Sequence, residues 1–252
     1  MGVDAGIPDF RGKGGIWGAD GPFGKFGMTA EDMSNPRWYR EEPAFIWGHH
    51  VVMRRMFRDC SPHAGYHLLQ EWARARPAGY HVYTSNVDNH FQRAGFDPER
   101  VFECHGSFDY MQCAGPCTTE IWHRSEAVGP DIDDMSVDPD TLRAHEPLPS
   151  CPRCGGVARP NVVLFVDEGW LSGRLQERVK RYLEWVKSVA NRRLCIVEIG
   201  AGVVIDTVRR ECESRRGTLI RINPSAPEVP DGGLSIARPA LEALQLIAEH
   251  MS

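Results

Sequence analysis

Residues 80–106 hold two short apolar segments, and each ends in polar residues. The first, at 81–83, runs into the polar sequence of residues 84–89. The second, at 100–104, leads directly into His105. In an open α/β sheet, polar side chains at the C-terminal ends of strands line the crevice that binds ligands. This stretch therefore predicts two strands of an α/β sheet whose ends face one site.

The rest of the chain repeats the alternation of helix and strand that is typical of α/β folds. Apolar residues recur at three and four positions in the expected helices, and short apolar runs mark the expected strands. We expect helices over 41–57, 175–189, 203–212 and 241–247, and a further helix that ends at Pro77 and begins at Ser61-Pro62, with Ser61 as its cap. Strands are expected over 161–165, 194–199 and 218–222.

Length and composition narrow the class of protein. The chain has 252 residues, enough for one large or two modest domains, and 42% hydrophobic residues provide a core. A net charge of −5 argues against general binding to nucleic acid or membranes. No apolar run approaches the roughly 18 residues that span a bilayer. The N-terminal residues show no export signal, so we expect a cytoplasmic protein whose eight cysteines are metal ligands or packed thiols.

Four of the cysteines form two pairs, each on a tight turn rich in Gly or Pro. The pairs are Cys113 with Cys117, and Cys151 with Cys154. Four thiolates from two such turns suit a tetrahedral zinc ion, and a site filled by sulfur leaves no position for a catalytic water. We therefore expect a structural zinc ion. The alternative, four unligated thiols, would leave a small polar segment with little to stabilise it.

Single features of the expected crevice have ordinary explanations too. A histidine such as His105 is more often a hydrogen-bonded strand end than a catalyst. Asn86 and Asp88 are residue types that cap a following helix. The turn Gly200-Ala201-Gly202 has the shape of a nucleotide-binding loop, but a lone Gly-x-Gly is a weak signal.

The combination and order of these features is more specific than any one of them. In sequence order they are Gly6-Ile7-Pro8-Asp9-Phe10-Arg11-Gly12, Thr84-Ser85-Asn86-Val87-Asp88, His105-Gly106, the four cysteines, Arg159-Pro160 with Val162-Val163-Leu164-Phe165, Gly200-Ala201-Gly202 and Ile222-Asn223-Pro224. This order resembles the sirtuin family of NAD-dependent protein deacylases over essentially the whole chain, and looks most like its bacterial branch.

The resemblance implies an α/β fold with two parts. A Rossmann-like domain with a parallel sheet would bind NAD and comprise residues 1–15, 61–112 and 159–252. A smaller domain would combine a helical insertion, residues 16–60, with a zinc-binding module, residues 113–158. NAD and an acyl-lysine substrate would enter the cleft between the domains from different sides.

The resemblance also implies roles for single residues. His105 would be the general base. The residues implied to contact NAD are Ile7, Asp9, Phe10, Arg11, Ser85, Asn86, Asp88, Gly200, Gly202, Asn223 and Ser225. Those implied to flank the acyl-lysine are Val163, Leu164 and Phe165. The implied zinc ligands are Cys113, Cys117, Cys151 and Cys154.

The implied chemistry suits these residue types. The nicotinamide of NAD leaves, the acyl oxygen attacks the ribose carbon, and a ribose hydroxyl must then lose a proton. A base that titrates near neutral pH suits that step, and histidine is the natural choice.

The chain departs from the family pattern in three places. The family has an apolar strand and a Gly-Ala-Gly turn before the position of Met1, so we expect either a native start upstream or weakened NAD binding. Val166 and Asp167 replace the usual Gly and Glu or Asp, and Val at a position of positive φ costs energy. Ser85 replaces a Gln, and Ala201 with Gly202 replaces Thr-Ser, which shortens polar reach toward NAD.

Three functions remain open at this point. The leading one is a deacylase that uses NAD and an acyl-lysine protein or peptide, with no membrane or direct nucleic-acid partner. A second is an NAD glycohydrolase or mono-ADP-ribosyltransferase that shares the first step. A third is a non-catalytic binding module held together by zinc.

Overall fold

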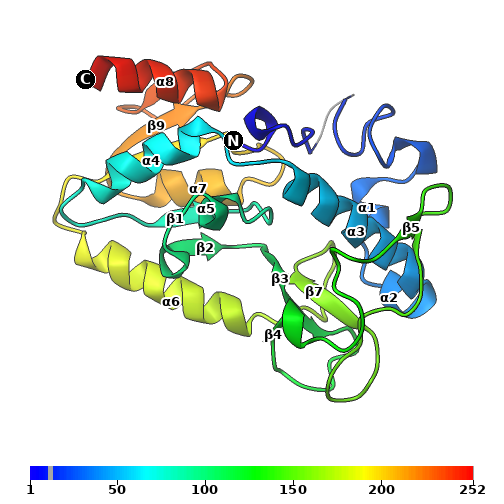
Figure 1. Cartoon of the computed structure of the whole chain (residues 1–252). Helices are drawn as coiled ribbons and strands as arrows, with labels where there is room; N and C mark the ends of the chain where they lie inside the picture. Colours follow the sequence, from blue (N-terminus) through cyan, green and yellow to red (C-terminus); the bar gives the residue numbers. More distant parts are fainter. Residues whose placement is uncertain (11–13, 252) are drawn as a thin grey trace.

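The computed structural model describes residues 1–10 and 14–251, arranged as two halves (Figure 1). The helices and strands occur in this order: η1 Val3–Ala5, η2 Gly24–Phe26, α1 Ala30–Met33, α2 Trp38–Glu41, α3 Pro43–Asp59, α4 Ala64–Arg74, β1 Val82–Thr84, α5 His90–Arg93, η3 Pro98–Arg100, β2 Val101–Glu103, β3 Gly106–Cys113, β4 Trp122–His123, η4 Arg124–Glu126, β5 Val137–Asp138, β6 Arg143–Ala144, β7 Ala158–Val162, α6 Gly173–Ser188, β8 Cys195–Ile199, α7 Thr207–Ser214, β9 Thr218–Ile222, β10 Leu234–Ile236 and α8 Ala240–Met251.

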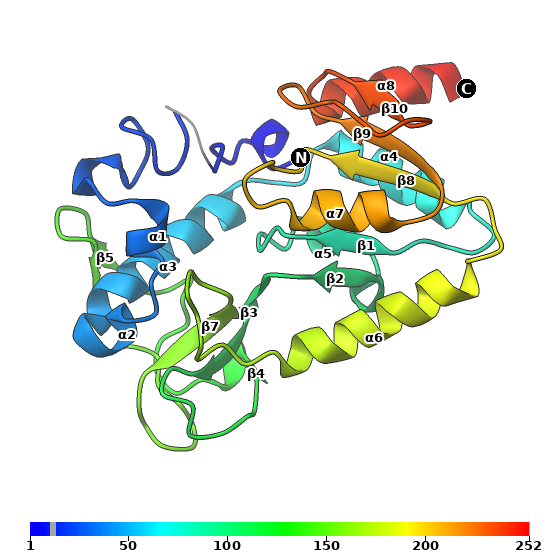
Figure 2. The ribbon, with the colours of Figure 1, turned by 180° about the vertical axis from the view of Figure 1, so that it is seen from behind.

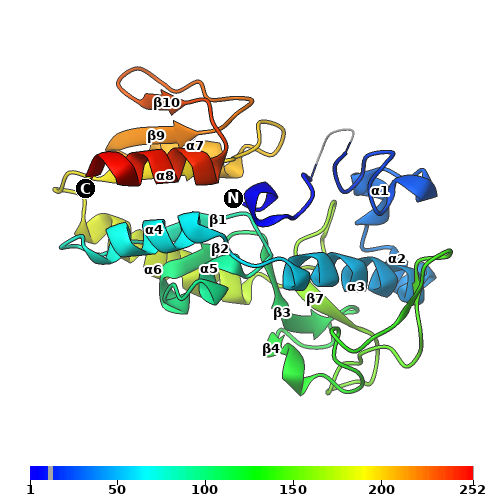
Figure 3. The same ribbon diagram turned by 45° about the horizontal axis from the view of Figure 1, so that its top comes forward.

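The larger half contains the parallel strands of an α/β fold, in two groups. Strand β1 pairs with β2, and β9 lies between β8 and β10. Helices α4 and α8 lie on one side of these strands and α6 lies on the other (Figures 1 and 3). Hydrogen-bonded ladders join the strands within each group, and among the described residues none joins β1 to β8.

Two buried apolar clusters support these groups. One, formed by Tyr66 and Val101 with their neighbours, lies beneath β1 and β2, and the other is centred on Ile222 and Leu244. Met1 packs against both clusters, so the N-terminal loop bridges the two groups of strands. The same loop is held to α8 by the amide of Leu241, which donates to the carboxylate of Asp4 at 3.2 Å.

The other half joins segments that are far apart in the sequence (Figure 2). One buried core includes Trp47 on α3, Phe108 on β3 and Ala158 on β7. The indole nitrogen of Trp47 donates to the carbonyl of Ala158 at 3.0 Å. Gly48 permits this packing, because a Cβ atom there would lie 2.0 Å from the carbonyl oxygen of Leu142. The helix α3 is therefore fixed against the segments that carry the cysteines.

Most expected elements form, with boundary shifts that have identifiable causes. Helix α4 begins at Ala64, and His63 caps it by accepting from the amide of Gly65, so the expected cap at Ser61 is wrong. The expected strand at 161–165 forms at 158–162 instead, paired with β3 in an antiparallel ladder. The expected helix from residue 203 begins only at Thr207.

The structure has no helix, among the residues it describes, that is both long enough and apolar enough to cross a bilayer.

Candidate active site

His105 lies at the sharp turn between β2 and β3. The next residue, Gly106, has a φ of 83°, and a Cβ atom there would lie 2.0 Å from the carbonyl oxygen of Asn161. Only glycine fits that close approach without a shift of the backbone. The carbonyl of His105 accepts from the amide of Val163 at 3.0 Å. The backbone of His105 is thus fixed between the end of β2 and the segment after β7.

The environment of His105 favours a neutral imidazole. Burial lowers the pKa of His105 below its ordinary value, and a hydrogen bond with the backbone of Ser85 opposes this shift. A histidine with a lowered pKa is mostly unprotonated at pH 7 and is ready to accept a proton. His105 therefore has the protonation state that a general base requires.

Asn86 and Asp88 lie on the loop that follows β1, directly after Ser85, whose backbone bonds to His105. The amide of Asn86 donates to the hydroxyl of Thr84 at 3.0 Å, and its side chain donates to the carboxylate of Asp88 at 3.2 Å. Asp88 is buried, and its other oxygen accepts from the amide of His90 at 2.9 Å. The two residues expected to bind the cofactor are therefore joined to each other, and Asp88 also caps α5.

A second polar turn follows β8 and β9. Gly200 has a φ of 63°, and its amide donates to the carbonyl of Ile222 at 2.9 Å. The side chain of Asn223 donates to the carbonyl of Ala201 and accepts from the amides of Ser225 and Ala226, all at 3.0 to 3.1 Å. Gly202 has open space where a Cβ would be. Asn223 thus joins the Gly-x-Gly turn to the loop after β9.

The N-terminal loop supplies the remaining expected contacts. Ile7 is buried in the core of the smaller half, and Asp9 is exposed, with its carbonyl accepting from the amide of Ile16 at 2.7 Å. The ring of Phe10 is 39% exposed and meets the edge of Trp17 at 6.0 Å between centroids. Arg11, expected near the phosphates, lies outside the described residues.

The expected acyl-lysine segment, residues 163–165, runs beside the histidine. Its first amide bonds to His105, and the amide of Phe165 donates to the carbonyl of Ser34 at 3.1 Å. The amide of Leu164 donates to the carboxylate of Asp167 at 2.9 Å. After Val163, the next amide that could join the ladder with β3 is that of Phe165, and it is bonded to Ser34 instead. This explains why β7 ends at Val162.

A buried ion pair holds this segment, and sequence reasoning did not identify it. Arg159 and Asp167 are about 1% and 0% exposed, and their guanidinium and carboxylate groups form two parallel hydrogen bonds of 2.5 and 2.8 Å. Arg159 also donates to the carbonyl of Val162 at 2.9 Å, and its guanidinium lies 4.9 Å from the ring centroid of Tyr39. The sequence offered one signal for this ion pair, which is an arginine, Arg159, next to a proline inside an otherwise apolar strand.

Val166 follows this segment in a strained conformation. Its φ is 53° and its side chain is 83% exposed. The left-handed region costs a β-branched residue roughly 1–2 kcal/mol, because Cβ approaches the carbonyl oxygen. The sequence-based expectation of a positive φ at this position is confirmed.

The Val166→Gly variant should be more stable than the parent by about 0.5–1 kcal/mol, because relief of strain exceeds the entropy cost of glycine. Urea unfolding of both proteins measures this difference. Val203→Gly is the matched control, since Val203 is 61% exposed and not among the residues with positive φ. The control should lose stability, and a loss of equal size in Val166→Gly would contradict the assignment of strain.

Two neighbouring histidines are buried beneath the N-terminal loop. Neither ring nitrogen of His49 has a hydrogen-bond partner among the described residues, and its ring lies 5.5 Å from Trp17 and 5.0 Å from Phe23. His50 shares a 2.5 Å hydrogen bond with the hydroxyl of Tyr39. Burial lowers the pKa of His49 to about 3 and holds the pKa of His50 well below its ordinary value.

These histidines should make the protein sensitive to acid. The unfolded chain protonates both below about pH 6.5, whereas the folded chain protonates His49 only near pH 3, so stability falls as the pH falls through this window. At pH 5 His49 should cost roughly 2 kcal/mol, and His50 should add to this loss. Urea unfolding at pH 7 and pH 5 should show a smaller loss for His49→Leu than for the parent. The control His67→Leu, at an exposed position, should lose as much stability between pH 7 and pH 5 as the parent. An equal loss of stability in His49→Leu and His67→Leu would contradict this prediction.

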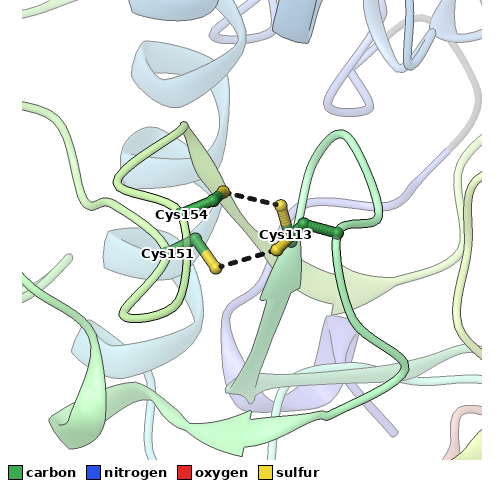
Figure 4. Close-up of side chains that lie close together, drawn as sticks. Cys113, Cys151 and Cys154 are labelled. Carbon is green, nitrogen blue, oxygen red and sulfur yellow. Dashed lines mark hydrogen bonds between the residues drawn. The ribbon is translucent and has the colours of Figure 1, made fainter.

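The four paired cysteines come together, and Figure 4 labels three of them, Cys113, Cys151 and Cys154. The sulfur atoms of Cys113 and Cys154 are 3.7 Å apart, as are those of Cys117 and Cys151, and all four lie within 4.8 Å of one another. Four thiolates at about 2.3 Å from a zinc ion in tetrahedral geometry lie about 3.8 Å apart. The amide of Gly156 points at the sulfur of Cys154 and lowers the pKa of that thiol to about 7. This donor set fits one structural zinc ion.

The described contacts connect most of the expected site in one series. The segment at 163–165 bonds to His105, His105 to the Ser85 backbone, and Asn86 to Asp88. The turn at 200–202 and Asn223 form a separate group, and the nitrogen of Met1 lies 3.7 Å from the position of a Cβ on Gly200. The cysteines are not part of this series. The arrangement combines a neutral base, an amide–carboxylate pair and a glycine-rich turn.

Comparison with known proteins shows one family. A model described as the Sir2 family matches residues 1–196. The NAD-dependent protein deacylase of Mycolicibacterium paratuberculosis is 27% identical over 261 residues, which cover 99% of this chain and 93% of that protein. Sirtuin-5 of Danio rerio, a mitochondrial NAD-dependent protein deacylase, is 30% identical over 191 residues, which cover 72% of this chain. That match spans only 58% of the length of the Danio protein.

Solved structures agree in fold. A Sir2 homologue in complex with NAD has a TM-score of 0.67 at 22% identity, covering 98% of this chain and 84% of that one. A complex of Sir2 with a p53 peptide and NAD has a TM-score of 0.62 at 19% identity, covering 100% of this chain and 89% of that one. At these identities the likeness concerns the fold.

Proposed function

The chain belongs to the Sir2 family, and from this premise we propose that it is an NAD-dependent protein-lysine deacylase. It would transfer an acyl group from a lysine side chain to ADP-ribose and release nicotinamide. The observation that supports this most directly is the hydrogen bond between the carbonyl of His105 and the amide of Val163. It places a neutral histidine beside the segment proposed to hold the acyl-lysine.

We propose that the two halves are the two domains expected from the sequence. Residues 1–15, 61–112 and 159–252 would bind NAD, and residues 16–60 and 113–158 would close over them. Trp47 on α3 shares a buried core with Met135 and Leu142, which supports grouping residues 16–60 with residues 113–158. Strands β3 and β7 belong to the same core and lie across the proposed boundary between the domains. We also propose a cytoplasmic location, with acyl-lysine proteins as partners and no direct contact with nucleic acid, in line with the net charge of −5.

The residues divide the work of binding as follows. Asn86 and Asp88, already joined to each other, would hold the nicotinamide and its ribose, with Ile7 and Asp9 near the carboxamide. Phe10 would shield the reacting carbon from water. The adenosine side would be bound by Gly200, Gly202, Asn223 and Ser225.

When bound, NAD supplies a nicotinamide leaving group and a ribose carbon that accepts the acyl oxygen. His105 would take a proton from a ribose hydroxyl through its neutral imidazole, the form that burial favours. Val163, Leu164 and Phe165 would orient the acyl-lysine through a backbone already tied to His105, Asp167 and Ser34. The four cysteines would hold a zinc ion that stabilises the smaller domain, with no open position for catalysis.

The function is tested by incubating the protein with NAD, with and without an acetyl-lysine peptide, and following nicotinamide. Release that depends on the peptide is the expected result. Release without peptide would overturn the proposal in favour of an NAD glycohydrolase or mono-ADP-ribosyltransferase. No release under either condition would favour a zinc-stabilised binding module.

A further inference from the structure

A small cavity lies where three parts of the chain meet, away from the proposed active site. Its volume is about 250 Å³, and its walls are rich in arginine. The lining residues are Arg54, Arg58, Asn89, Arg93, Asp109, His123 and Arg124. They come from α3, from the loop and helix around α5, and from the β3–η4 region. The cavity therefore joins the helical insertion, the larger half and the cysteine-bearing segment.

Three of the four arginines have carboxylate partners, and two of these three, Arg54 and Arg124, are held most firmly in the cavity wall. Arg54 lies 3.4 Å from Asp109 and 3.1 Å from Asp133. Arg124 lies 3.6 Å from Asp109 and 2.8 Å from Asp133, and it also contacts Asp131. These pairs fix both guanidinium groups in the cavity wall and neutralise Asp109, the one carboxylate among the lining residues.

The other two arginines are less fully paired. Arg93 donates to the carbonyls of Phe57 and Arg58 at 2.8 and 3.2 Å, and no described carboxylate forms an ion pair with it. Arg58 is 42% exposed and bonds to its neighbour Asp59 and to Asp133. Four guanidinium groups present more N–H donors than the surrounding carboxylates accept. The surrounding carboxylates match the arginines in number, so the cavity offers spare N–H donors rather than a large net charge. Arg93 has no ion-pair partner among the described residues.

The volume of the cavity and the geometry of its hydrogen-bond donors indicate the chemical class of the ligand. A cavity of about 250 Å³ is smaller than typical sites for whole cofactors. Guanidinium forks match the oxygen atoms of phosphate groups through paired hydrogen bonds. A phosphate or diphosphate group has enough acceptors to use donors on several walls at once.

We propose that this cavity is a binding site for a small phosphate-type anion that ties the smaller half to the loop after β1. The connection to the active site is short. Asn89 lines the cavity, adopts a φ of 64°, and its side chain bonds to Asp109, while the preceding residue is Asp88. An anion bound here would hold Arg58 and Arg93 together across the junction of α3 and α5.

Isothermal titration of the full chain with inorganic pyrophosphate, at constant ionic strength and without NAD, tests the proposal. We expect one saturable site. Arg58→Gln should weaken binding about tenfold or more, because one charge-assisted hydrogen bond is lost. Arg58→Lys should also weaken binding, because it keeps the charge but loses the fork. Arg93→Gln provides a second position, and circular dichroism verifies that each variant is folded.

The matched control is Arg210→Gln on α7, which removes one positive charge from a side chain that is 73% exposed and paired with Asp206. It should bind pyrophosphate as the parent does. The absence of saturable binding, or equal weakening by Arg210→Gln and Arg58→Gln, would overturn the proposal. Equal binding of succinate would overturn the assignment to phosphate-type anions. None of these outcomes depends on deacylase activity.

Discussion

His105→Ala should lower the rate of peptide deacylation by about 10² to 10⁴, the usual range for loss of a general base. The reason is that the variant lacks the neutral imidazole that is proposed to accept the ribose proton. The measurement is formation of deacylated peptide under saturating NAD and peptide. His67→Ala, an exposed histidine on α4, is the matched control and should keep the parental rate.

The dependence of the deacylation rate on pH tests the role of His105 in a second way. Because burial lowers the pKa of His105, the parental rate should persist below pH 6.5 and fall only as the pH drops through that lowered pKa. The acid limb of kcat/KM measures this value in the free protein. An unchanged rate in His105→Ala would remove the histidine from the mechanism, and an acid limb above pH 6.5 would contradict the effect of burial.

Cys151→Ala should abolish stoichiometric zinc binding and unfold the cysteine-bearing segment. Cys151 is buried and belongs both to the sulfur cluster and to the core that includes Trp47. Structural zinc contributes about 10–16 kcal/mol in small zinc-binding peptides, more than the typical stability of a whole domain. Elemental analysis of the purified protein measures the metal, and thermal unfolding measures the stability.

Cys195→Ala is the control for this experiment, because Cys195 is exposed on β8 and lies outside the cluster. It should retain one zinc ion per chain and the parental unfolding temperature. A chelator should reproduce the effect of Cys151→Ala on the parent. Equal zinc content in the two variants would show that the four sulfur atoms do not hold the ion.

Local patterns in the sequence predicted the elements whose contacts are near in the chain. The strand at 218–222 forms as expected, since it is a short apolar run between clear turn signals. The two cysteine pairs come together as expected, because their turns restrict where each thiol can point. Neither prediction needed information about distant residues.

The predictions that failed depended on distant partners. The strand expected at 161–165 ends early because the amide of Phe165, the next one that could join the ladder with β3, is bonded to Ser34. The segment is also held by Asp167, which is paired with Arg159. No local pattern shows that a charged pair is fully buried. The cap of α4 moved from Ser61 to His63, a residue type with a weak capping preference, whose ring nitrogen accepts the amide of Gly65.

Part of the candidate site was also accessible from the sequence. The order of motifs predicted His105, Asn86 and Asp88 as site residues. The structure joins Asn86 to Asp88 and bonds His105 to the backbone of Ser85. The bond from Val163 to His105 was not predictable, because 58 residues of chain separate them and the zinc-bearing segment lies between. Its existence depends on how β3 and β7 pair.

That amide–carbonyl link has a kinetic consequence. A peptide bound as proposed, against the segment after β7, would contact backbone that is hydrogen-bonded to the residue carrying the imidazole. Peptide binding and proton transfer would then both depend on this hydrogen bond. Substitutions that weaken the hydrogen bond between Val163 and His105 should change the Michaelis constant and the turnover number together. With such an enzyme, a poorly fitting peptide would bind more weakly and would also be turned over more slowly.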